Sequence, residues 1–492
     1  MKKIFLSIIL CCVAISTLFS QTYTTPNTGV NWTLDDIAAI SPTTLTISGN
    51  NYTLLENLVI SENDTVSINT DIILSIDSDL LITVFGTFTV NSNAVTITAV
   101  NEVAPYEGFR FEEFSVINIQ NATIEYGGGL RVLTETFAIN NCTITQNVAG
   151  GATTGAVISL SRGLPQITNN TITFNELPAI ASGANQSVSA YIFNNYIEGN
   201  NQSNANRPQI NMGTTRVTDT LKIIQNTIIG DPSLDLVGGI AVANLVGGTI
   251  RVIIDDNIIQ DNRYGLTVVG PDSFAYIRNN VIEDNNTQNI PFQGGSGVSL
   301  NTNSGTMEVI AEGNEFRRNL WGITVIGTAS INLGDEFDSF GNNVFSENGN
   351  EGELYALYNN TPNTIMAKNN CWIEGQVNTL EDAEAVIFHQ TDDENLGEVI
   401  YDPVGVGCEN LSIEDLAFES FSFYPNPSEG EINFNNIHSF TEITIYGIQG
   451  NLILTKTITE GENRLRFNMP QGLYFVNFRN ENQQIVKKLL VK

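Results

Sequence analysis

One short polar pattern recurs ten times between residues 122 and 375, and it limits what this chain can fold into more than any other feature. A typical copy reads Asn, any residue, Ile or Phe, two further residues and a second Asn. The first position of successive copies is separated by 20 to 34 residues. A polar residue type repeated at this spacing is typical of coils stacked along one axis.

The two Asn positions define two columns. After Ala122 and Cys142, the first column holds Asn170, Asn195, Asn226, Asn257, Asn280, Asn314, Asn343 and Asn370. The second column, five residues further on, holds Asn147, Asn175, Asn200, Asp231, Asn262, Asn285, Asn319 and Asn348. Asn tolerates left-handed backbone conformations, so we expect both columns at tight bends. An amide also donates and accepts hydrogen bonds, so stacked copies can bond from coil to coil.

An unbroken apolar column lies two residues after the first Asn column. Its members are Ile124, Ile144, Ile172, Ile197, Ile228, Ile259, Ile282, Phe316, Phe345 and Trp372. Such a column indicates side chains stacked in an interior. The shortest repeats leave no room for a helix and its turns, whereas three short strands fit. The sequence therefore predicts an all-β chain built on a parallel β-helix of roughly twelve coils, about 55–60 Å long.

The stretches on both sides of the repeats follow the same organisation. Residues 44–61 and 80–98 alternate apolar and polar positions, as half-buried strands do. Three further stretches resemble the right-handed parallel β-helix superfamily, with its pectate-lyase-like coils. Its early coils are similar to YEGFRFEEFSVINIQNATIEYGGG (106–129). Its final coils are similar to NNCWIEG (369–375) and IFHQTDDENLGEVIYDPV (387–404). The resemblance covers 44–409, leaves 21–43 as an N-terminal cap, and implies a fold without an activity.

The beginning of the chain reads as an export signal. Residues 1–20 start with two lysines after Met1 and continue as an apolar stretch that is too short for a transmembrane helix. This pattern predicts a secretory signal peptide that is cleaved after Ser20. Adjacent cysteines at 11 and 12 raise the alternative of a lipoprotein signal, but Leu10 stands where a small residue is needed.

Residues 421–492 form a separate domain after a linker at 410–420. Alternating strands with Gly and Pro turns predict a small β-sandwich. The motifs Tyr424-Pro425-Asn426-Pro427 and Gly472-Leu473-Tyr474, with the basic end at 487–492, resemble the type A C-terminal sorting domain of the type IX secretion system of the Bacteroidota. The resemblance implies the secretion machinery as a partner, passage across the outer membrane, and removal of the domain or attachment of the product to surface lipopolysaccharide. Nothing in the sequence predicts a transmembrane segment.

The charge of the chain is concentrated in its body. The whole chain carries −32, and residues 21–420 hold 12 Lys and Arg against 47 Asp and Glu, a balance of −35. A secreted body this acidic does not bind nucleic acid or anionic lipid by charge. It could collect calcium, which is the one cofactor that the sequence leaves open.

Three cysteines remain after removal of the signal peptide. Cys371 and Cys408 bracket the terminal cap, where a disulfide between them suits an exported protein. Cys142 stands in the first column, where later coils have Asn, and we expect a small buried residue there.

Residues suited to catalysis are scarce. The chain has two histidines, His389 and His438, so we predict neither a catalytic His nor a His-based metal site. His389 stands where relatives of the β-helix superfamily more often carry Asp. A polysaccharide lyase is the alternative, because it needs only calcium-binding carboxylates and an Arg or Lys base. Arg278 lies between Asp255 and Glu312 at matching positions of neighbouring coils. The same arrangement is typical of a structural charge ladder, which we favour.

Two aromatic residues point to a binding surface instead. Tyr264 and Trp321 each stand two residues after a second-column Asn and are each followed by Gly, on coils two apart. Two coils span about 10 Å, near the length of a disaccharide. The sequence therefore favours a secreted, surface-displayed, non-catalytic protein, adhesive or structural, that binds a polysaccharide or cell-surface glycan. The alternative is a lyase or related enzyme that acts on uronate-containing glycans.

Overall fold

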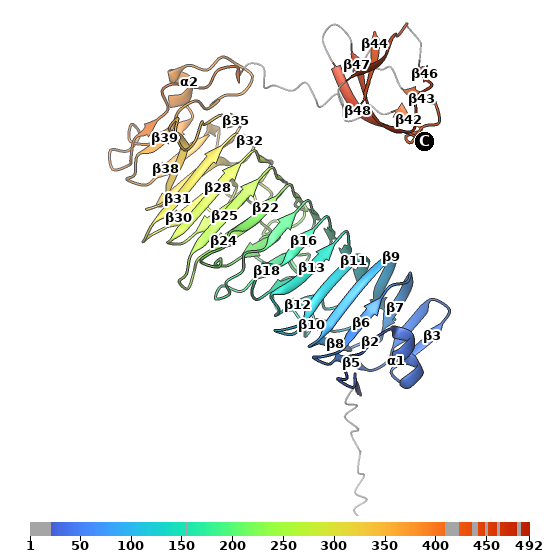
Figure 1. Ribbon diagram of the computed structural model, residues 1–492. Coiled ribbons are helices and arrows are strands. Elements are labelled where there is room, and N and C mark those ends of the chain that lie inside the picture. Colours follow the sequence, from blue (N-terminus) through green and yellow to red (C-terminus); the bar gives the residue numbers. More distant parts are fainter. Residues whose placement is uncertain are drawn as a thin grey trace, which may run out of the picture. The chain divides into compact units, whose positions relative to one another are not determined.

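The computed structural model describes residues 21–408 except residue 154, and residues 423–492 except 435–440, 448–450, 460–462 and 480–483. The chain falls into two compact units, divided after Glu409. The expected signal peptide at 1–20 and linker at 410–420 lie outside the described residues. The first unit is a right-handed parallel β-helix (Figure 1) and the second is a small β-sandwich, which confirms the expected all-β fold class.

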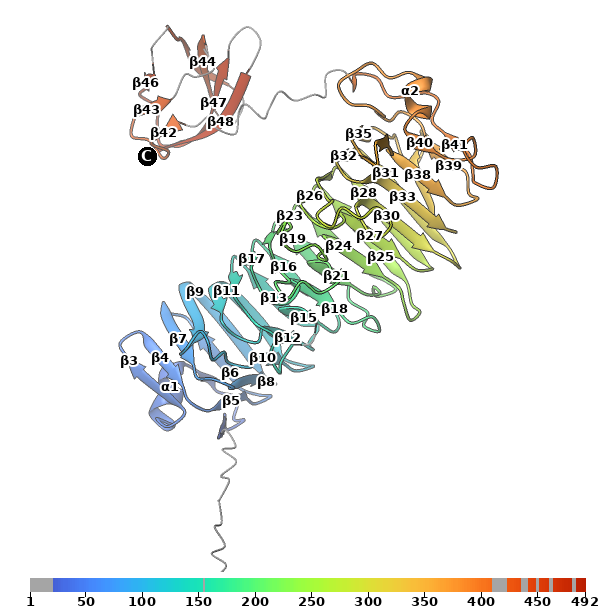
Figure 2. The ribbon, with the colours of Figure 1, turned by 180° about the vertical axis from the view of Figure 1, so that it is seen from behind.

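One face of the β-helix is a parallel sheet of fourteen strands, called sheet A here, whose strands lie side by side in chain order (Figure 1, Figure 2). The sheet exceeds the roughly twelve coils expected because β1 and β40, at the two ends, pair with it as well. Its strands are β1 (Thr22–Thr24), β5 (Asn57–Ile60), β8 (Leu81–Val84), β10 (Gly108–Phe111), β12 (Leu130–Val132), β15 (Ile158–Leu160), β18 (Ile180–Ser182), β21 (Ile210–Met212), β24 (Ile240–Ala243), β27 (Leu266–Val269), β30 (Ser296–Thr302), β33 (Trp321–Gly327), β38 (Leu357–Asn360) and β40 (Ile387–Phe388).

Two further stacks of strands complete the coils, and β9 (Thr87–Ala99) and β11 (Val116–Glu125) belong to both. The stack before the first Asn column holds β2 (Asn31–Trp32), β6 (Thr65–Ile68), β13 (Thr136–Asn140), β16 (Gln166–Thr168), β19 (Tyr191–Phe193), β22 (Leu221–Ile224), β25 (Ile250–Asp255), β28 (Ser273–Arg278), β31 (Met307–Glu312), β34 (Ser330–Gly334), β39 (Ile365–Ala367) and β41 (Val399–Ile400). The stack between the Asn columns holds β4 (Asn51–Leu54), β7 (Ile72–Ile76), β14 (Thr143–Thr145), β17 (Thr171–Thr173), β20 (Tyr196–Glu198), β23 (Thr227–Ile229), β26 (Ile258–Gln260), β29 (Val281–Glu283), β32 (Glu315–Arg317) and β35 (Val344–Ser346). Three short strands per coil agree with the prediction.

The apolar column predicted from the sequence lies inside the coils. Its isoleucines pair in register from coil to coil and are fully buried from Ile172 to Ile282. Toward the C-terminal end the column continues as Phe316, Phe345 and Trp372, whose neighbouring rings stack with centroids 5.1 Å apart. Each coil therefore buries one large side chain against the same position of the next.

The Asn columns form the predicted ladders of side-chain hydrogen bonds. From Asn170 to Asn343, the Nδ2 of each first-column Asn donates to the Oδ1 of the next column member, over 2.8 to 3.0 Å. The backbone N–H of the same residue donates to that oxygen as well. Nδ2 also reaches a backbone carbonyl of the preceding coil, as from Asn195 to Ile167. Each buried amide thus satisfies itself and backbone groups that would otherwise lack partners.

The bends themselves are made by a different residue from the one expected. The residue before each first-column position has a left-handed backbone, as Asn169, Asn194 and Asn279 do with φ of 57°, 53° and 54°. The column residues do not appear among the described residues with positive φ. The left-handed residue turns the chain, and the following Asn can then direct its amide inward.

The second column departs from the sequence pattern at one coil. Asp231 lies outside the ladder and accepts hydrogen bonds from Ser233 in a surface loop. The fully buried Gln209 takes its place. Its Oε1 accepts from the backbone N–H and Nδ2 of Asn200, both at 3.2 Å, and its Nε2 donates to Oδ1 of Asn262 at 3.1 Å. The longer Gln side chain reaches the ladder from a position outside the motif.

Gln209→Leu is expected to lower the free energy of unfolding by about 2–4 kcal/mol, because it leaves the backbone N–H of Asn200 and Oδ1 of Asn262 without partners in the interior. Asp231→Ala is the matched control and should change it by less than about 1 kcal/mol, because that side chain serves only a surface loop. Urea unfolding of both variants measures the two effects. A larger loss for Asp231→Ala would show that the ladder has been assigned to the wrong residue.

The N-terminal end of the β-helix is closed by α1 (Leu34–Ile40) and by β3 (Leu45–Ser48), which pairs antiparallel with β4. Thr33 caps the helix: its side chain accepts from the N–H of Asp36, and the Asp36 carboxylate accepts from the N–H of Thr33. Leu34 and Ile37 bury the inner face of the helix. The segment 21–43 also supplies β1 and β2, which pair with the coils.

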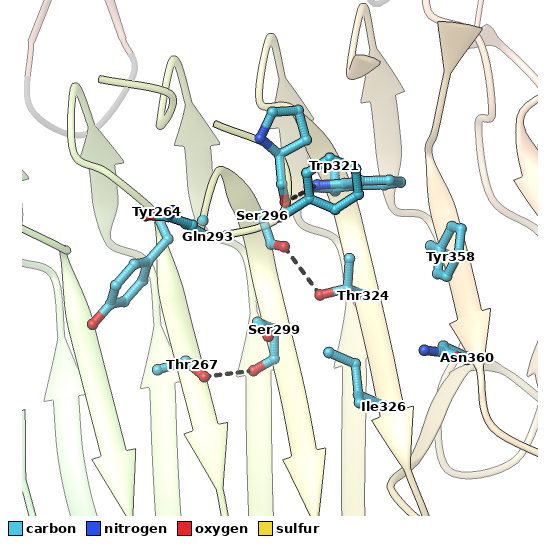
Figure 3. Close-up of a pocket in the computed structure, with 13 residues that line it drawn as sticks. Tyr264, Thr267, Gln293, Ser296, Ser299, Trp321, Thr324, Ile326, Tyr358 and Asn360 are labelled. Atoms are coloured by element: carbon cyan, nitrogen blue, oxygen red, sulfur yellow. Dashed lines mark hydrogen bonds between the residues drawn. The ribbon is translucent and has the colours of Figure 1, made fainter. Parts of the chain in front are cut away.

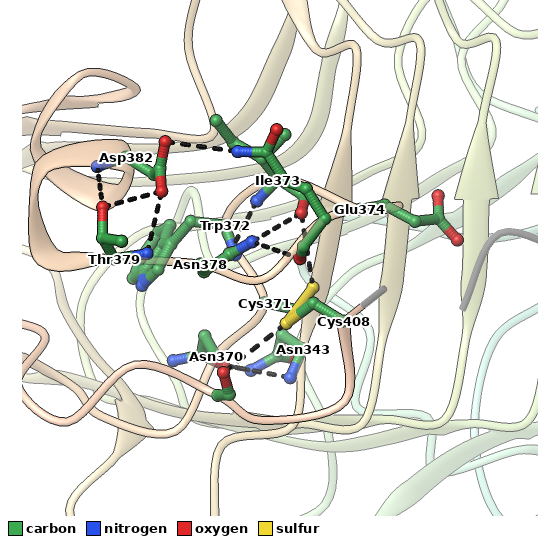
Figure 4. Close-up of a disulfide and its surroundings, with 12 residues drawn as sticks. Asn343, Asn370, Cys371, Trp372, Ile373, Glu374, Asn378, Thr379, Asp382 and Cys408 are labelled. Atoms are coloured by element: carbon green, nitrogen blue, oxygen red, sulfur yellow. Dashed lines mark hydrogen bonds between the residues drawn. A yellow bond between two sulfur atoms is a disulfide. The ribbon is translucent and has the colours of Figure 1, made fainter. Parts of the chain in front are cut away.

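The C-terminal end carries α2 (Leu380–Glu384), the hairpin of β36 (Gly349–Asn350) and β37 (Glu353–Leu354), and a disulfide. The disulfide joins Cys371 to Cys408, with Cα atoms 5.6 Å apart (Figure 4). It closes a loop of 37 residues. Closing a loop of this length lowers the conformational entropy of the unfolded chain enough to stabilise the fold by roughly 3–4 kcal/mol. The remaining described cysteine, Cys142, is buried in the first column as expected, and its N–H donates to Oδ1 of Asn170.

The C-terminal unit consists of two antiparallel sheets around a core of its own. One sheet contains β42 (Phe423–Tyr424), β43 (Glu431–Phe434) and β46 (Arg464–Arg466). The other contains β45 (Leu452–Thr457), β44 (Glu442–Gly447), β47 (Gly472–Arg479) and β48 (Gln484–Val491). Ile432 and Leu465 of the first sheet and Val476 and Phe478 of the second are fully buried in this core.

Candidate functional site

Side chains at one register position form a column along the outer face of sheet A. From β15 to β33 this outer column contains only small or short polar side chains, namely Ser159, Ala181, Asn211, Ala241, Thr267, Ser299 and Thr324. Arg110 and Arg131 precede them on β10 and β12. Tyr358 and Phe388 follow them on β38 and β40. The face therefore has a floor of small side chains with a cationic end and an aromatic end.

A pocket of about 510 Å³ opens on the aromatic half of this face. Thr267, Ser299, Thr324 and Tyr358 line it from four neighbouring strands, and the loop 291–294 borders it ahead of β30 (Figure 3). The hydroxyl of Thr267 donates to the carbonyl of Ser299 at 3.0 Å. The hydroxyls of Ser296 and Thr324 bond to each other over 3.0 Å. The lining thus combines aromatic rings with hydroxyl groups on a rigid sheet.

Trp321, predicted as a binding residue, lies in the wall of this pocket. Its indole Nε1 donates to the carbonyl of Pro291 at 3.1 Å, which ties the ring to the bordering loop. Its ring lies 4.7 Å from that of Tyr355 and 5.1 Å from that of Tyr358, between centroids. Tyr358 in turn stacks on Phe388 at 4.6 Å. Trp321 is therefore one member of an aromatic cluster that continues onto the next two coils.

Tyr264 lines the same pocket, but its ring packs toward the preceding coil. A Cβ atom added to Gly238 would lie 2.2 Å from its Cζ, so the ring covers that glycine. Burial raises the pKa of its hydroxyl to about 12. The structure thus brings Tyr264 and Trp321 to one pocket, with Trp321 bordering the loop and Tyr264 closing the other side.

The glycine that follows each of these two aromatics has a packing role. A Cβ at Gly265 would lie 2.5 Å from the carbonyl oxygen of Gly297, and one at Gly322 would lie 2.3 Å from that of Ala356. Glycines at the start of neighbouring sheet A strands therefore let the coils approach closely. The repeated aromatic-Gly pair reflects this close approach.

Phe292, like Tyr358, is one of the lining residues that sequence reasoning missed. It stands in the loop between β29 and β30, and 89% of its surface is exposed. Its side chain borders the pocket and is open to contact with a ligand. The loop falls between two copies of the repeat and matches no motif, so only its position in space reveals it.

Arg278, the third predicted residue, lies on a different stack, away from the pocket. It pairs in register with Asp255 and Glu312 on the neighbouring coils and bonds to Asp255 at 2.9 Å. Its guanidinium also lies 5.2 Å from the ring centroid of Tyr276. The hydrogen bond to Asp255 raises the pKa of Arg278 and keeps the guanidinium protonated, so it is not available to accept a proton. These contacts are those of a charge ladder.

His389 has a structural role, and the described residues contain no cluster of metal-binding side chains. His389 is buried, accepts from the N–H of Val399 on Nδ1 and faces Glu384 with Nε2 at 3.2 Å, which fixes the C-terminal cap. Within the described ranges, no three His, Cys, Asp or Glu side chains gather in a way that could hold a metal ion. Among the same residues, no helix has the length and apolar character needed to cross a membrane.

Residues 422–492 match the family described as the secretion system C-terminal sorting domain. The protein is therefore a right-handed parallel β-helix exported by the type IX secretion system, and its last domain directs it to the cell surface. No curated protein matches the sequence. Among solved structures, the periplasmic alginate epimerase AlgG is similar, with a TM-score of 0.36 and 12% identity over 76% of this chain and 83% of that chain. Its epimerase activity is a property of that protein.

Arg278→Ala is expected to lower the free energy of unfolding by less than about 1 kcal/mol, because its side chain is 41% exposed and its ion pair lies at the surface. Arg317→Ala is the matched comparison. Arg317 is 14% exposed and bonds to Glu374, which is 9% exposed, so its loss leaves a buried charge unpaired and should cost about 2 kcal/mol or more. Equal losses in chemical denaturation would contradict the surface-ladder role of Arg278.

Proposed function

We propose that this is a non-catalytic protein of the cell surface that binds a glycan through the aromatic pocket on sheet A, in an adhesive or structural role. The observation that carries the proposal is an exposed aromatic rim over a floor of hydroxyl groups. Phe292 is 89% exposed, and the half-buried Trp321 and Tyr358 line the same pocket. Aromatic rings that keep one face open are well suited to the apolar faces of sugar rings.

The size and lining of the pocket support a saccharide ligand. Its volume of about 510 Å³ falls within the roughly 300–1,000 Å³ of ligand sites. It extends over four strands from β27 to β38, which is about 14 Å along the axis. Ser299 and Asn360 offer polar groups beside the rings, and these can bond to sugar hydroxyls. A short stretch of polysaccharide fits this combination.

Phe292→Ala and Trp321→Ala are each expected to weaken glycan binding about tenfold or more, because each removes a ring that excludes water from the sugar face. Phe337→Ala is the matched control, since Phe337 is 86% exposed and does not line the pocket. The measurement is titration of the purified protein with a panel of neutral and acidic polysaccharides. Phe292→Ala changes no buried packing, so it tests the proposal even if Trp321→Ala perturbs the fold.

Binding to none of the polysaccharides, or equal effects of Phe292→Ala and Phe337→Ala, would contradict the glycan site. The same samples test the non-catalytic part of the proposal. Ultraviolet absorbance from a new double bond, with or without calcium, would identify a lyase and overturn it.

Attachment to lipopolysaccharide is our proposal for how the protein stays at the surface. The sorting domain supports this proposal, since it has its own sheets and core and is a separate unit from the β-helix. Removal of the domain after export would leave the β-helix free for attachment at its C-terminal end. Loss of surface retention in cells that lack the lipopolysaccharide glycan would support this mode, and full retention would contradict it.

Deletion of 422–492 is expected to leave the β-helix folded and trapped in the periplasm, because each unit has a separate core. Cell fractionation followed by limited proteolysis measures both location and folding. A truncated protein that still reaches the surface would show that the sorting domain is dispensable for export.

A further inference from the structure

A second pocket on the outer face of sheet A gathers positive charge on an otherwise acidic body. It encloses about 400 Å³ over β12, β15, β18 and β21. Arg131 and Arg207 line it together with the polar side chains of Ser161, Ser182 and Asn211. Its lining residues include no Asp or Glu. The pocket is therefore locally cationic, although residues 21–420 carry −35.

Most other cations of the described β-helix are already neutralised. Seven form ion pairs with carboxylates, namely Arg110, Arg162, Arg216, Arg278, Arg317, Arg318 and Lys368. Arg263 is bonded to Gln288, Asn206 and the carbonyl of Gln293. Arg131 and Arg207 form no side-chain ion pair or hydrogen bond with any described residue. Two unpaired guanidinium groups thus meet in one pocket.

Arg131 carries a positive charge that no described carboxylate balances. It is half-buried, and its Nε is buried without a hydrogen-bond partner. Its register neighbour on β10 is Arg110, and like charges on adjacent strands destabilise a sheet. Glu112 bonds to Arg110 at 2.5 Å and compensates that residue only. An anion in the pocket would balance the charge of Arg131.

We propose that this pocket binds a negatively charged oxygen group of a glycan, either a carboxylate or a sulfate ester. Guanidinium groups bind both through paired hydrogen bonds. The neighbouring Ser and Asn groups suit the hydroxyls of a sugar. The inference rests on the proposed glycan-binding function and adds the charge of the ligand to it.

The register of sheet A connects this pocket to the aromatic one. Asn211 lines the cationic pocket and Thr267 lines the aromatic pocket, and only Ala241 separates them in the outer column. The distance of two strands is about 10 Å. The small side chain of Ala241 leaves the floor between the pockets low. One polysaccharide chain that runs along the axis can therefore occupy both pockets.

The test uses the full protein and three polymers with a common backbone: dextran, dextran sulfate and carboxymethyl dextran. The double variant Arg131→Gln, Arg207→Gln should bind the charged polymers at least about tenfold more weakly than the unmodified protein. The double variant Lys222→Gln, Arg251→Gln is the control. It removes the same charge from exposed positions that line neither pocket, and its binding should be unchanged.

The polymers also identify the source of the anion. Preference for dextran sulfate assigns a sulfate ester, and preference for carboxymethyl dextran assigns a carboxylate. Equal losses in the two double variants, no loss in either, or no binding of a charged polymer by the unmodified protein would overturn the inference. Displacement by polyglutamate as effective as by the charged dextrans would assign the pocket to acidic peptides and also overturn it.

Comparing Phe292→Ala with the arginine double variant distinguishes failure of the anion pocket from failure of the proposed glycan site. If Phe292→Ala weakens binding in the polysaccharide panel and the arginine variant does not, the glycan site stands and the anion pocket falls. If neither variant alters binding to any glycan, both fall. Thermal unfolding without ligand controls for folding, and the arginine variant should be no less stable than the unmodified protein, because it removes a like-charge pair.

Discussion

The hydrogen bond between stacked Asn amides is the interaction on which the rest of this structure depends. A narrow coil must bury backbone groups at every bend, and unpaired groups there are costly. One inward amide per bend satisfies its own groups and the neighbouring backbone, and it connects to the next coil. The ladder thereby holds each coil in register with the next. Because the register is constant, side chains on the outer face of sheet A also align, and the two pockets exist as a consequence.

The fold could be predicted from the sequence because its interior is periodic. The apolar column from Ile172 to Trp372 and the first Asn column occupy the positions that the pattern indicated, and the second Asn column does so except at Asp231. The prediction that the column Asn residues themselves make the bends was wrong. An Asn before the column and an Asn in it look alike in sequence, and only the backbone φ separates them. Gln209 could not be foreseen either, since it enters the ladder from a loop whose path has no periodicity.

The candidate site was less predictable from the sequence because most of its residues lie outside the repeated motif. Trp321 and Tyr264 could be selected because they follow the repeat, and both line the aromatic pocket. Phe292 lies in an insertion, and Arg131 and Arg207 stand in coils that share no motif at those positions. Their meeting depends on the register of sheet A and on loop conformation. Arg278 was prominent in sequence because its neighbours are oppositely charged, and that same feature makes it structural.

The two ends of the β-helix are closed by different kinds of contact, and this difference determines the end from which the β-helix unfolds. In a stack of coils each unit contacts mainly its neighbours, so stability is a sum of local terms and unfolding proceeds inward from an end. The C-terminal end is held by a covalent bond between Cys371 and Cys408. The N-terminal end is held by a short helix and a hairpin alone. Fraying should therefore start at the N-terminal coils and reach the cationic pocket on β12 to β21 before the aromatic pocket on β27 to β38, which lies nearer to the covalently closed end.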